Sequence, residues 1–229
     1  MDNLFRFKQF SMHNSRAAMK IGTDGVLLGA AMTLKKEDRK LLDVGTGTGV
    51  VSMLAACRLD EAGADWRISA LDTDPESVEE AALNFRESPW GGRMEARLLP
   101  LQEFGPESKF DCIFSNPPYY DCSLTNPDER EKNARHSCTL SYRDICEFAR
   151  AYLSTCGRLS LILPSELETI LRRTAVSYGL YPFRTVRIRT AAGKKPARIL
   201  AEFCKEAAGN VSEEEIHVKD NPYTNKFYL

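Results

Sequence analysis

Short apolar runs recur along this chain, with room for a helix between each pair. Runs with few polar interruptions are typical of strands that are buried on both faces of a parallel sheet. Such runs occur at KLLDV (40–44), RISALD (67–72), MEARLL (94–99), FDCIFS (110–115) and RLSLIL (158–163). We expect each of these segments to be a strand.

The segments between the runs carry helical signals. Residues 24–32 predict a helix capped by Thr23 or Asp24, and Asp74 followed by Pro75 predicts the start of another. Residues 50–59 continue the apolar pattern as a further helix. Spacings of i, i+3, i+4 and i+7 give two helices an apolar face: Val78, Ala81, Ala82 and Phe85 in one, Ile145, Phe148, Ala149 and Tyr152 in the other.

The pattern changes in the last third of the chain. Ser165 and Glu168 have the spacing of a capping box and predict one more helix. Residues 183–190 and 197–203 are then two strand-like runs that flank AAGKKP, which predicts an antiparallel hairpin. Strands that alternate with helices and then end in a hairpin predict an α/β fold. We expect a Rossmann-like doubly wound sheet, mostly parallel, with an antiparallel C-terminal hairpin at its edge.

We expect residues 1–229 to form one domain, with a leader at 1–39 and a catalytic core at 40–229. No strand is expected in the leader, and the polar, proline-containing stretch 116–139 predicts a long loop. Ligands of doubly wound sheets bind beyond the carboxyl ends of the strands, so the motifs that follow strands are the candidates for a site.

Composition narrows the possible classes of protein. The 229 residues have a net charge of −1 and are 43% hydrophobic, which excludes wholesale disorder and a uniformly basic surface. No apolar run approaches the roughly 20 residues of a membrane span, and the amino-terminal stretch has no apolar signal segment. Seven widely spaced cysteines without C-x-x-C predict neither disulfides nor a metal site, so we expect a cytoplasmic protein with reduced cysteines.

Charge is distributed unevenly along the chain. Residues 1–20 carry four basic side chains and one acidic one, and 184–198 carry no acid. The basic side chains of the second segment are Arg184, Arg187, Arg189, Lys194, Lys195 and Arg198. Lysines at a hairpin tip are often merely solvated. Two basic segments still favour phosphate contact on one side of the molecule, with acids such as 213–215 lying elsewhere.

A glycine cluster follows the first core strand, with Gly45, Gly47 and Gly49 in the stretch LLDVGTGTGVV. Glycines here allow a tight turn and a close approach to a ligand, although a turn without a ligand has the same composition. A dinucleotide-binding protein would have G-x-G-x-x-G, but that spacing reaches Val50 or Ser52 instead of glycine.

The observed spacing is D-x-G-x-G-x-G, with Asp43 at the end of the strand. It resembles motif I of the S-adenosylmethionine-dependent methyltransferases. A carboxylate beside the turn suits a cationic sulfonium and ammonium better than a pyrophosphate. Asp72, at the end of the next strand, can accept hydrogen bonds from both ribose hydroxyls of either cofactor.

Asn116, Pro117, Pro118 and Tyr119 directly follow the strand FDCIFS. The prolines make a rigid loop in which the Asn116 side chain and the Pro117 carbonyl can both accept hydrogen bonds. Two acceptors can hold an exocyclic NH2 and turn its lone pair toward a methyl donor, so positioning carries the reaction. Tyr119 offers a flat face for stacking an extruded base. A rigid structural turn is the alternative.

The two motifs together resemble amino-methyltransferases that carry N-P-P-Y. Further segments resemble the bacterial family that N6-methylates adenine-37 of tRNA(Val): Phe7–Phe10, Met19–Gly29, Asn116–Tyr120, Ala134–His136 and Lys195–Arg198. This resemblance implies S-adenosylmethionine as the cofactor and tRNA as the partner. It implies Lys20, Thr23 and Asp24 near the methionine end of the cofactor, and Arg135 and His136 over the target nucleotide. Tyr120, Lys194, Lys195 and Arg198 are the further candidates for RNA contact.

One position departs from many relatives of this family. Pro100 stands where they have an aspartate near the cofactor adenine, so we expect Leu101 or Gln102 to supply contacts there. His136 can equally be a solvated loop residue, and we do not expect a general base. Three other functions stay open: methylation of another nucleic acid, methylation of a protein glutamine, or a non-catalytic S-adenosylmethionine-binding module on RNA. The sequence leaves the oligomeric state open, with a monomer as the simplest expectation.

Overall fold

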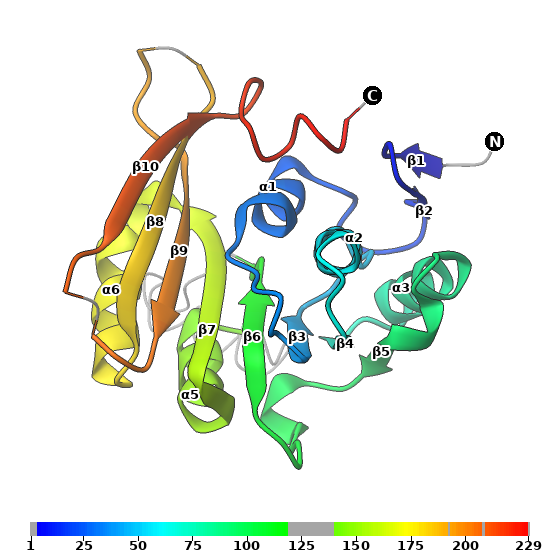
Figure 1. The fold of residues 1–229 in the computed structure, drawn as a ribbon, viewed down its shortest axis with the longest axis horizontal. Helices are drawn as coiled ribbons and strands as arrows, with labels where there is room; N and C mark the ends of the chain where they lie inside the picture. Colours follow the sequence, from blue (N-terminus) through cyan, green and yellow to red (C-terminus); the bar gives the residue numbers. More distant parts are fainter. Residues whose placement is uncertain (1–3, 119–139, 192, 208, 229) are drawn as a thin grey trace, which may run out of the picture.

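The computed structural model describes residues 4–118, 140–191, 193–207 and 209–228. These residues form an eight-stranded sheet flanked by helices, with a small two-stranded sheet near the amino terminus (Figure 1). The strands are β1 Leu4–Arg6, β2 Ser11–His13, β3 Lys40–Val44, β4 Arg67–Asp72, β5 Met94–Leu98, β6 Phe110–Ser115, β7 Leu153–Pro164, β8 Tyr181–Arg189, β9 Arg198–Cys204 and β10 Ser212–His217.

The helices are α1 Thr23–Ala31, α2 Val50–Glu61, α3 Pro75–Glu87, α5 Tyr142–Tyr152 and α6 Glu168–Ser177, with 3-10 turns at η1 Gly91–Arg93, η2 Leu101–Glu103 and η3 Ser165–Leu167. The large sheet has the strand order β10-β8-β9-β7-β6-β3-β4-β5. β3, β4, β5, β6 and β7 pair in parallel, whereas β9 is antiparallel to both of its neighbours. From β3 the chain adds β4 and β5 on one side, and then returns to add β6 and β7 on the other side of β3. The strand order therefore reverses between β3 and β6, which is the switch point of the sheet.

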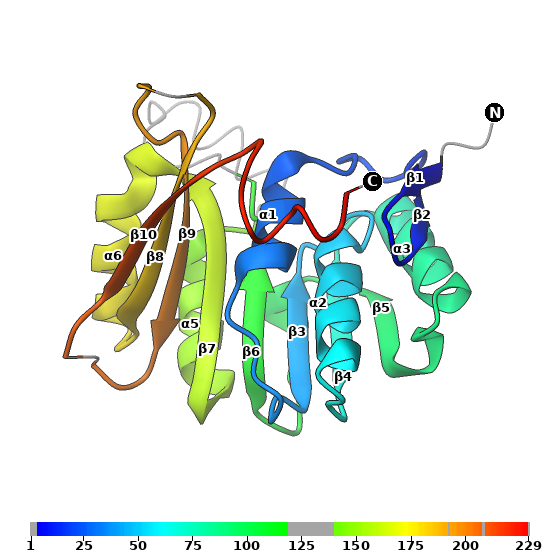
Figure 2. The ribbon, with the colours of Figure 1, turned by 45° about the horizontal axis from the view of Figure 1, so that its top comes forward.

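The sheet separates two apolar clusters, one on each face. Leu41 faces the cluster beneath α1, α2 and α3, while Leu42, the next residue of β3, faces the cluster beneath α5 and α6. The ribbon shows the same layering, with α1 and α2 on one side of the sheet and α5 and α6 on the other (Figure 2). Burial on both faces explains why the parallel strands are continuous apolar runs.

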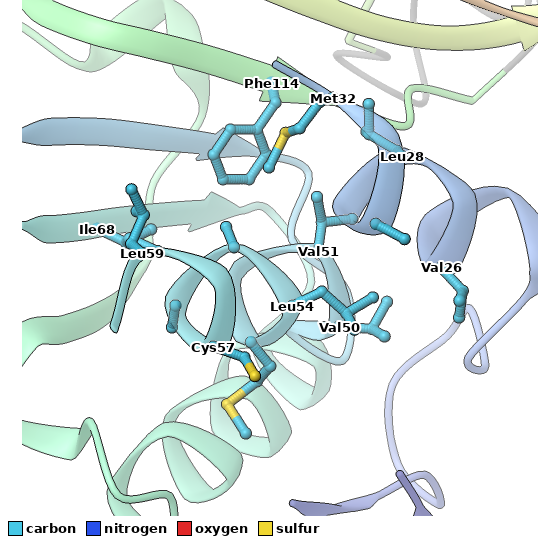
Figure 3. Packing of buried hydrophobic residues seen from close by; sticks show 14 of the residues in the cluster. Val26, Leu28, Met32, Val50, Val51, Leu54, Cys57, Leu59, Ile68 and Phe114 are labelled. Carbon is cyan, nitrogen blue, oxygen red and sulfur yellow. The ribbon is translucent and has the colours of Figure 1, made fainter. Parts of the chain in front are cut away.

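Helices α1 and α2 pack closely because two glycines of α1 face α2. A Cβ on Gly25 would meet Val50 Cγ1 at 3.0 Å, and one on Gly29 would meet Leu54 Cβ at 2.8 Å. Val26, Leu28, Val51 and Leu54 surround this contact, with Phe114 of β6 nearby (Figure 3). The close contact fixes the start of α1 beside the start of α2, directly over the carboxyl end of β3.

Two predicted helix starts are wrong. Gly22 is the N-cap of α1, Thr23 is already helical, and no side chain caps the helix. Ser165 and Glu168 form no capping box, because 165–167 are a 3-10 turn and α6 begins at Glu168. A capping box that sequence reasoning missed opens α5, where Ser141 and Asp144 bond each other's backbone N–H groups. Asp74 caps α3 as predicted.

The predicted hairpin is confirmed as β8 and β9, but it does not form the edge. β9 lies between β7 and β8, and β10, which was not predicted, pairs in parallel with β8 as the outermost strand. This arrangement brings the acids of 213–215 against the arginines of β8. The ion pairs are Arg184 with Glu214 and Glu202, Arg187 with Glu213 and Glu168, and Arg189 with Glu215. The expectation that these acids lie elsewhere is therefore wrong.

The carboxyl-terminal segment returns from β10 across α1 and α2 toward the leader (Figure 2). There the backbone N–H of Lys8 donates to Phe227 O at 2.9 Å, and the Phe227 side chain is fully buried. The residues contacted, 7–9, connect β1 and β2, two strands that were also missed by the sequence reasoning. None of the helices in the described ranges is long and apolar enough to cross a membrane.

Candidate functional site

A cavity of about 540 Å³ opens at the carboxyl edge of β3, β4 and β6. Its walls come from several parts of the chain. These are the leader at 18–20, the start of α1, the turn after β3 with the first residues of α2, the end of β4 with the start of α3, the segment 99–102, the residues that follow β6, and Leu140. The glycine motif, Asp72 and Asn116, which lie far apart in the sequence, therefore share one site.

All three glycines of the motif have backbone angles that favour glycine. Gly45, Gly47 and Gly49 have φ values of 73°, 54° and 84°. Gly45 and Gly47 line the cavity, and their N–H groups are already bonded within the protein. Gly45 N–H donates to Leu71 O at 2.9 Å, and Gly47 N–H donates to the Asp72 carboxylate at 2.8 Å.

Gly49 does not line the cavity and has a packing role. A Cβ at this position would lie 2.6 Å from Cε1 of Phe85 on α3. The absence of a side chain lets the start of α2 approach α3, because even a small added volume in a packed core forces the neighbours to move.

Asp43 lies beneath the turn and does not line the cavity. Its carboxylate is 1% exposed and accepts hydrogen bonds from Thr46 Oγ1 at 2.9 Å and Ser52 Oγ at 2.7 Å. Burial raises the pKa of Asp43 to about 6, although the bonds from Ser52 and Thr46 act in the opposite direction. The described contacts make Asp43 a support for the turn, because it joins the turn to the first residues of α2.

Asp72 lines the cavity at the end of β4, as the sequence predicts for a ribose-binding carboxylate. One of its oxygens accepts the Gly47 N–H, and the other accepts the N–H groups of Thr73 and Asp74. These three bonds hold the carboxylate at the cavity wall and link the glycine turn to the start of α3.

Lys20, Thr23 and Asp24 all line the cavity. The Lys20 ammonium donates to the carbonyls of the leader itself, Ser15 O at 2.7 Å and Ala17 O at 2.9 Å. Asp24 accepts from Arg198 Nε at 2.8 Å, so the arginine expected at the RNA surface is tied to the wall of the cavity.

The segment after β5 forms the apolar part of the wall. Leu101 and Gln102, which the sequence predicts at this position, line the cavity together with Leu99. Leu101 is buried, and Gln102 Nε2 donates to Asp144 of α5 at 3.3 Å. Pro100 is the N-cap of η2, the 3-10 turn that presents these residues.

Asn116 and Pro118 line the cavity beside the glycine turn, because β6 and β3 are neighbouring parallel strands, and Pro117 is buried. The end of β6 is tied to β3 beside this position, because Ser115 Oγ donates to Val44 O at 2.6 Å. The other predicted residues of this region lie outside the described residues: Tyr119, Tyr120, Arg135 and His136.

The predicted RNA residues Lys194 and Lys195 are exposed in the turn between β8 and β9. β8 runs parallel to β6, because β9 is antiparallel to both β7 and β8. The turn that follows β8 therefore lies at the same edge of the sheet as the cavity. The ion pair between Arg198 and Asp24 joins the base of the hairpin to the cavity wall.

Two residues that contact the leader were missed by the sequence reasoning. Glu80 and Asn84 of α3 are buried and bind backbone groups of the leader. Their i, i+4 spacing beside Ala81 and Phe85 is a signal, because it places two polar side chains next to the apolar face of the helix.

Comparisons with known proteins agree with this geometry. Residues 14–174 match the model of the methyltransferase small domain family. The chain is 36% identical over 237 residues to a Bacteroides fragilis protein named tRNA1(Val) (adenine(37)-N6)-methyltransferase, with 98% of this chain and 97% of the relative covered. It is 35% identical over 228 residues to an Actinobacillus succinogenes protein of the same name, with 98% and 94% covered.

Among solved structures, a methyltransferase from Pyrococcus furiosus superposes with a TM-score of 0.58 and 19% identity. The superposition covers 86% of this chain and 88% of that protein. The likeness confirms the predicted Rossmann-like fold, with its mostly parallel sheet.

We expect Gly49→Ala to destabilise the protein more than Gly63→Ala does. Both glycines have positive φ, so each alanine meets backbone strain of about 1 kcal/mol. Only Gly49 also faces a side chain at clashing distance, which adds about 2 kcal/mol, whereas nothing lies within 4 Å of a Cβ at Gly63. Urea unfolding of the two variants measures the difference, and equal losses would contradict the packing role.

We expect Asp43 to make stability depend on pH. Its folded pKa of about 6 lies above its ordinary value of 3.8, so its stabilising contribution is complete below pH 4 and falls as the pH rises through 6. Asp43→Asn keeps an oxygen for Thr46 and Ser52 but does not titrate. Between pH 5 and pH 7 the free energy of unfolding should fall about 1 kcal/mol more in the wild type than in the variant. Parallel urea-unfolding profiles would rule this out.

Proposed function

The chain belongs to the methyltransferase small domain family and to the family of tRNA1(Val) (adenine(37)-N6)-methyltransferases, and on this premise we propose that it methylates the N6 amine of adenine in tRNA. The methyl donor is S-adenosylmethionine, and the target is adenine-37 of tRNA(Val). One observation carries the proposal: Asn116 of the N-P-P-Y motif lines the same cavity as the glycine turn.

The chemistry of the wall fits S-adenosylmethionine better than a dinucleotide. The N–H groups of Gly45, Thr46 and Gly47 bind protein oxygens, so they do not form a cradle for pyrophosphate. Asp24 and Asp72 both line the cavity. Because Asp24 is paired with Arg198, the negative charge that disfavours a pyrophosphate comes mainly from Asp72. Leu99 and Leu101 provide an apolar surface for a purine.

The residues of this chain divide the work of binding the cofactor. Asp72 would accept hydrogen bonds from the ribose hydroxyls. Gln102 and the backbone of the segment 99–102 bind the adenine, and Lys20, Thr23 and Asp24 surround the methionine end. When it is bound, the cofactor supplies a methyl group on a sulfonium, which is a good leaving group.

Asn116 performs the step that the chemistry requires of the protein. The lone pair of an exocyclic amine is delocalised into the ring. The amine becomes nucleophilic when its two N–H groups are held so that the lone pair is no longer conjugated with the ring. The side-chain oxygen of Asn116 and the carbonyl of Pro117 accept these two hydrogens. With S-adenosylmethionine bound, the amine would take the methyl group as the C–S bond breaks, the sulfur would keep that bonding pair, and the extra proton would leave to solvent. Orientation therefore replaces a general base.

The tRNA substrate follows from the relatives and from the charge near the cavity. Two relatives more than 30% identical over nearly their full length are named for adenine-37 of tRNA1(Val). Lys194 and Lys195 are exposed at the cavity edge, where they can contact phosphates. Tyr119 would stack the target base, and Tyr120, Arg135 and His136 would contact the tRNA. We place the enzyme in the cytoplasm with its substrate.

The function is tested with tRNA from a strain that lacks this protein. Nucleoside mass spectrometry should find N6-methyladenosine missing at position 37 of tRNA(Val), and the purified enzyme should restore it with labelled S-adenosylmethionine. Label in rRNA or in protein glutamine instead would overturn the substrate. Cofactor binding without transfer to any fraction would indicate a binding module.

We expect Asn116→Ala to abolish methyl transfer while cofactor binding stays. The variant loses the side-chain acceptor for the amine, which lowers kcat by about 100-fold or more, since the interaction acts in the transition state. Single-turnover assays measure the rate, and isothermal titration with S-adenosylmethionine is the control. A variant with the wild-type rate would disprove the proposed role.

We expect the double variant Lys194→Ala, Lys195→Ala to bind tRNA more weakly and with less dependence on salt. Each lost phosphate contact should reduce the slope of log K against log salt by about 1. The matched control is Lys35→Ala, Lys36→Ala, an exposed pair that precedes the amino end of β3, at the opposite edge of the sheet. Equal slopes for the two double variants would exclude the hairpin as the contact.

A further inference from the structure

One stripe of α3 faces the leader. Glu80, Asn84 and Glu87 follow each other at i, i+4 and i+7, and each binds the stretch between His13 and Ala17. The first two are 1% and 2% exposed, so they are buried polar side chains that need partners inside the protein. Their partners are backbone groups of the leader and of the glycine turn.

The Glu80 carboxylate binds three successive backbone N–H groups. Ser15, Arg16 and Ala17 donate at 2.6, 2.8 and 2.9 Å, and the Ser15 hydroxyl adds a bond at 3.2 Å. Burial alone would raise the pKa of Glu80, but these backbone donors hold it below its ordinary value. The carboxylate therefore stays ionised. Residues 15–17 are neither helix nor strand, so their N–H groups have no partners in regular secondary structure, and Glu80 supplies the acceptors.

Asn84 joins the leader to the glycine turn. Its side-chain oxygen accepts the His13 N–H at 2.7 Å, and its NH2 donates to His13 O at 3.1 Å. The same NH2 donates to Thr48 O at 2.9 Å. One side chain thus fixes the leader relative to the turn between β3 and α2.

The other side of the leader segment is held by Lys20. Its ammonium binds the carbonyls of Ser15 and Ala17, two of the residues whose N–H groups bind Glu80. The residues that follow, 18–20, form one wall of the cavity. The conformation that places Lys20 at the cavity is therefore the one that Glu80 stabilises from beneath.

We propose that Glu80 and Asn84 are positioning residues of the cofactor site, which act through the leader without touching the cofactor. The inference rests on the proposed binding of S-adenosylmethionine in this cavity. A leader that is ordered only part of the time leaves a fraction of the molecules competent to bind, and the apparent affinity falls by that fraction. The buried anchor removes this loss before the cofactor arrives.

The test compares Glu80→Gln with Glu79→Gln. The first variant keeps the shape of the side chain but puts an NH2 group where a carboxylate oxygen accepts at least one leader N–H, and we expect the Kd for S-adenosylmethionine to rise about tenfold. Glu79 is the matched control, because it is the neighbouring residue in α3 and its side chain is 67% exposed. Within the described part of the leader, it forms an ion pair with Arg16 at 3.6 Å. Its variant should bind like the wild type.

Kinetics separate positioning from a loss of folded protein. In Glu80→Gln the KM for S-adenosylmethionine should rise about as much as the Kd, while kcat at saturating cofactor changes less than about twofold. A variant that is merely less folded would lose kcat at an unchanged KM, and that result would overturn the inference. Equal Kd values for Glu80→Gln and Glu79→Gln would overturn it as well. A wild-type protein that binds no S-adenosylmethionine would instead overturn the proposed function.

Hydrogen exchange of the wild-type protein keeps the inference testable if Glu80→Gln does not fold. The amide hydrogens of residues 15–17 should exchange slowly without cofactor and still more slowly with S-adenosylmethionine. Unprotected exchange of these amides in the cofactor-free protein would show that Glu80 does not hold the leader before the cofactor binds, and would contradict the inference.

Discussion

The position of the cavity walls depends on the turn between β3 and α2, and the buried carboxylate of Asp43 holds that turn in place. Asp43 accepts hydrogen bonds from the hydroxyl groups of Thr46 in the turn and Ser52 in α2, so the strand, the turn and the helix keep one relative orientation. Gly49 then allows α3 to pack against the start of α2. Since α3 carries the anchor of the leader, the position of the leader depends on that turn as well.

Several carboxylates of this protein bind its own backbone and arginines. Asp72 binds three N–H groups at the end of β4, and Glu80 binds three in the leader. On β9, Glu202 is fully buried and accepts from Thr33, Ser160 and Arg184. A buried carboxylate such as Glu80 or Glu202 is stable only with several donors, so it fixes the donors around it. The hydrogen bonds of Asp72 and Glu80 fix backbone segments at the walls of the cofactor site.

Sequence reasoning succeeded where the signal is local. β3, β4 and β6 were predicted because burial on both faces makes their apolar runs continuous, and the glycine and N-P-P-Y motifs follow these strands directly. Asp43 was expected beside the ligand, but the alternation along a strand puts it on the same face as Leu41, toward α2. β10 was missed because an edge strand with three consecutive glutamates has no apolar run. The role of Glu80 depends on contacts 65 residues away in the chain.

β10 also changes how the charge of the molecule is understood. The arginines of β8 form ion pairs with the glutamates of β10, and Arg198 forms one with Asp24. Most of the positive charge that the sequence suggests for 184–198 is therefore compensated within the protein. Paired arginines cannot release counterions from a nucleic acid as exposed cations do. The lysines at the tip of the hairpin are exposed beyond this network, at the edge where the cavity opens. In the proposed function, contact with RNA phosphates at this edge falls to these lysines, while the arginines beneath them keep the hairpin in place.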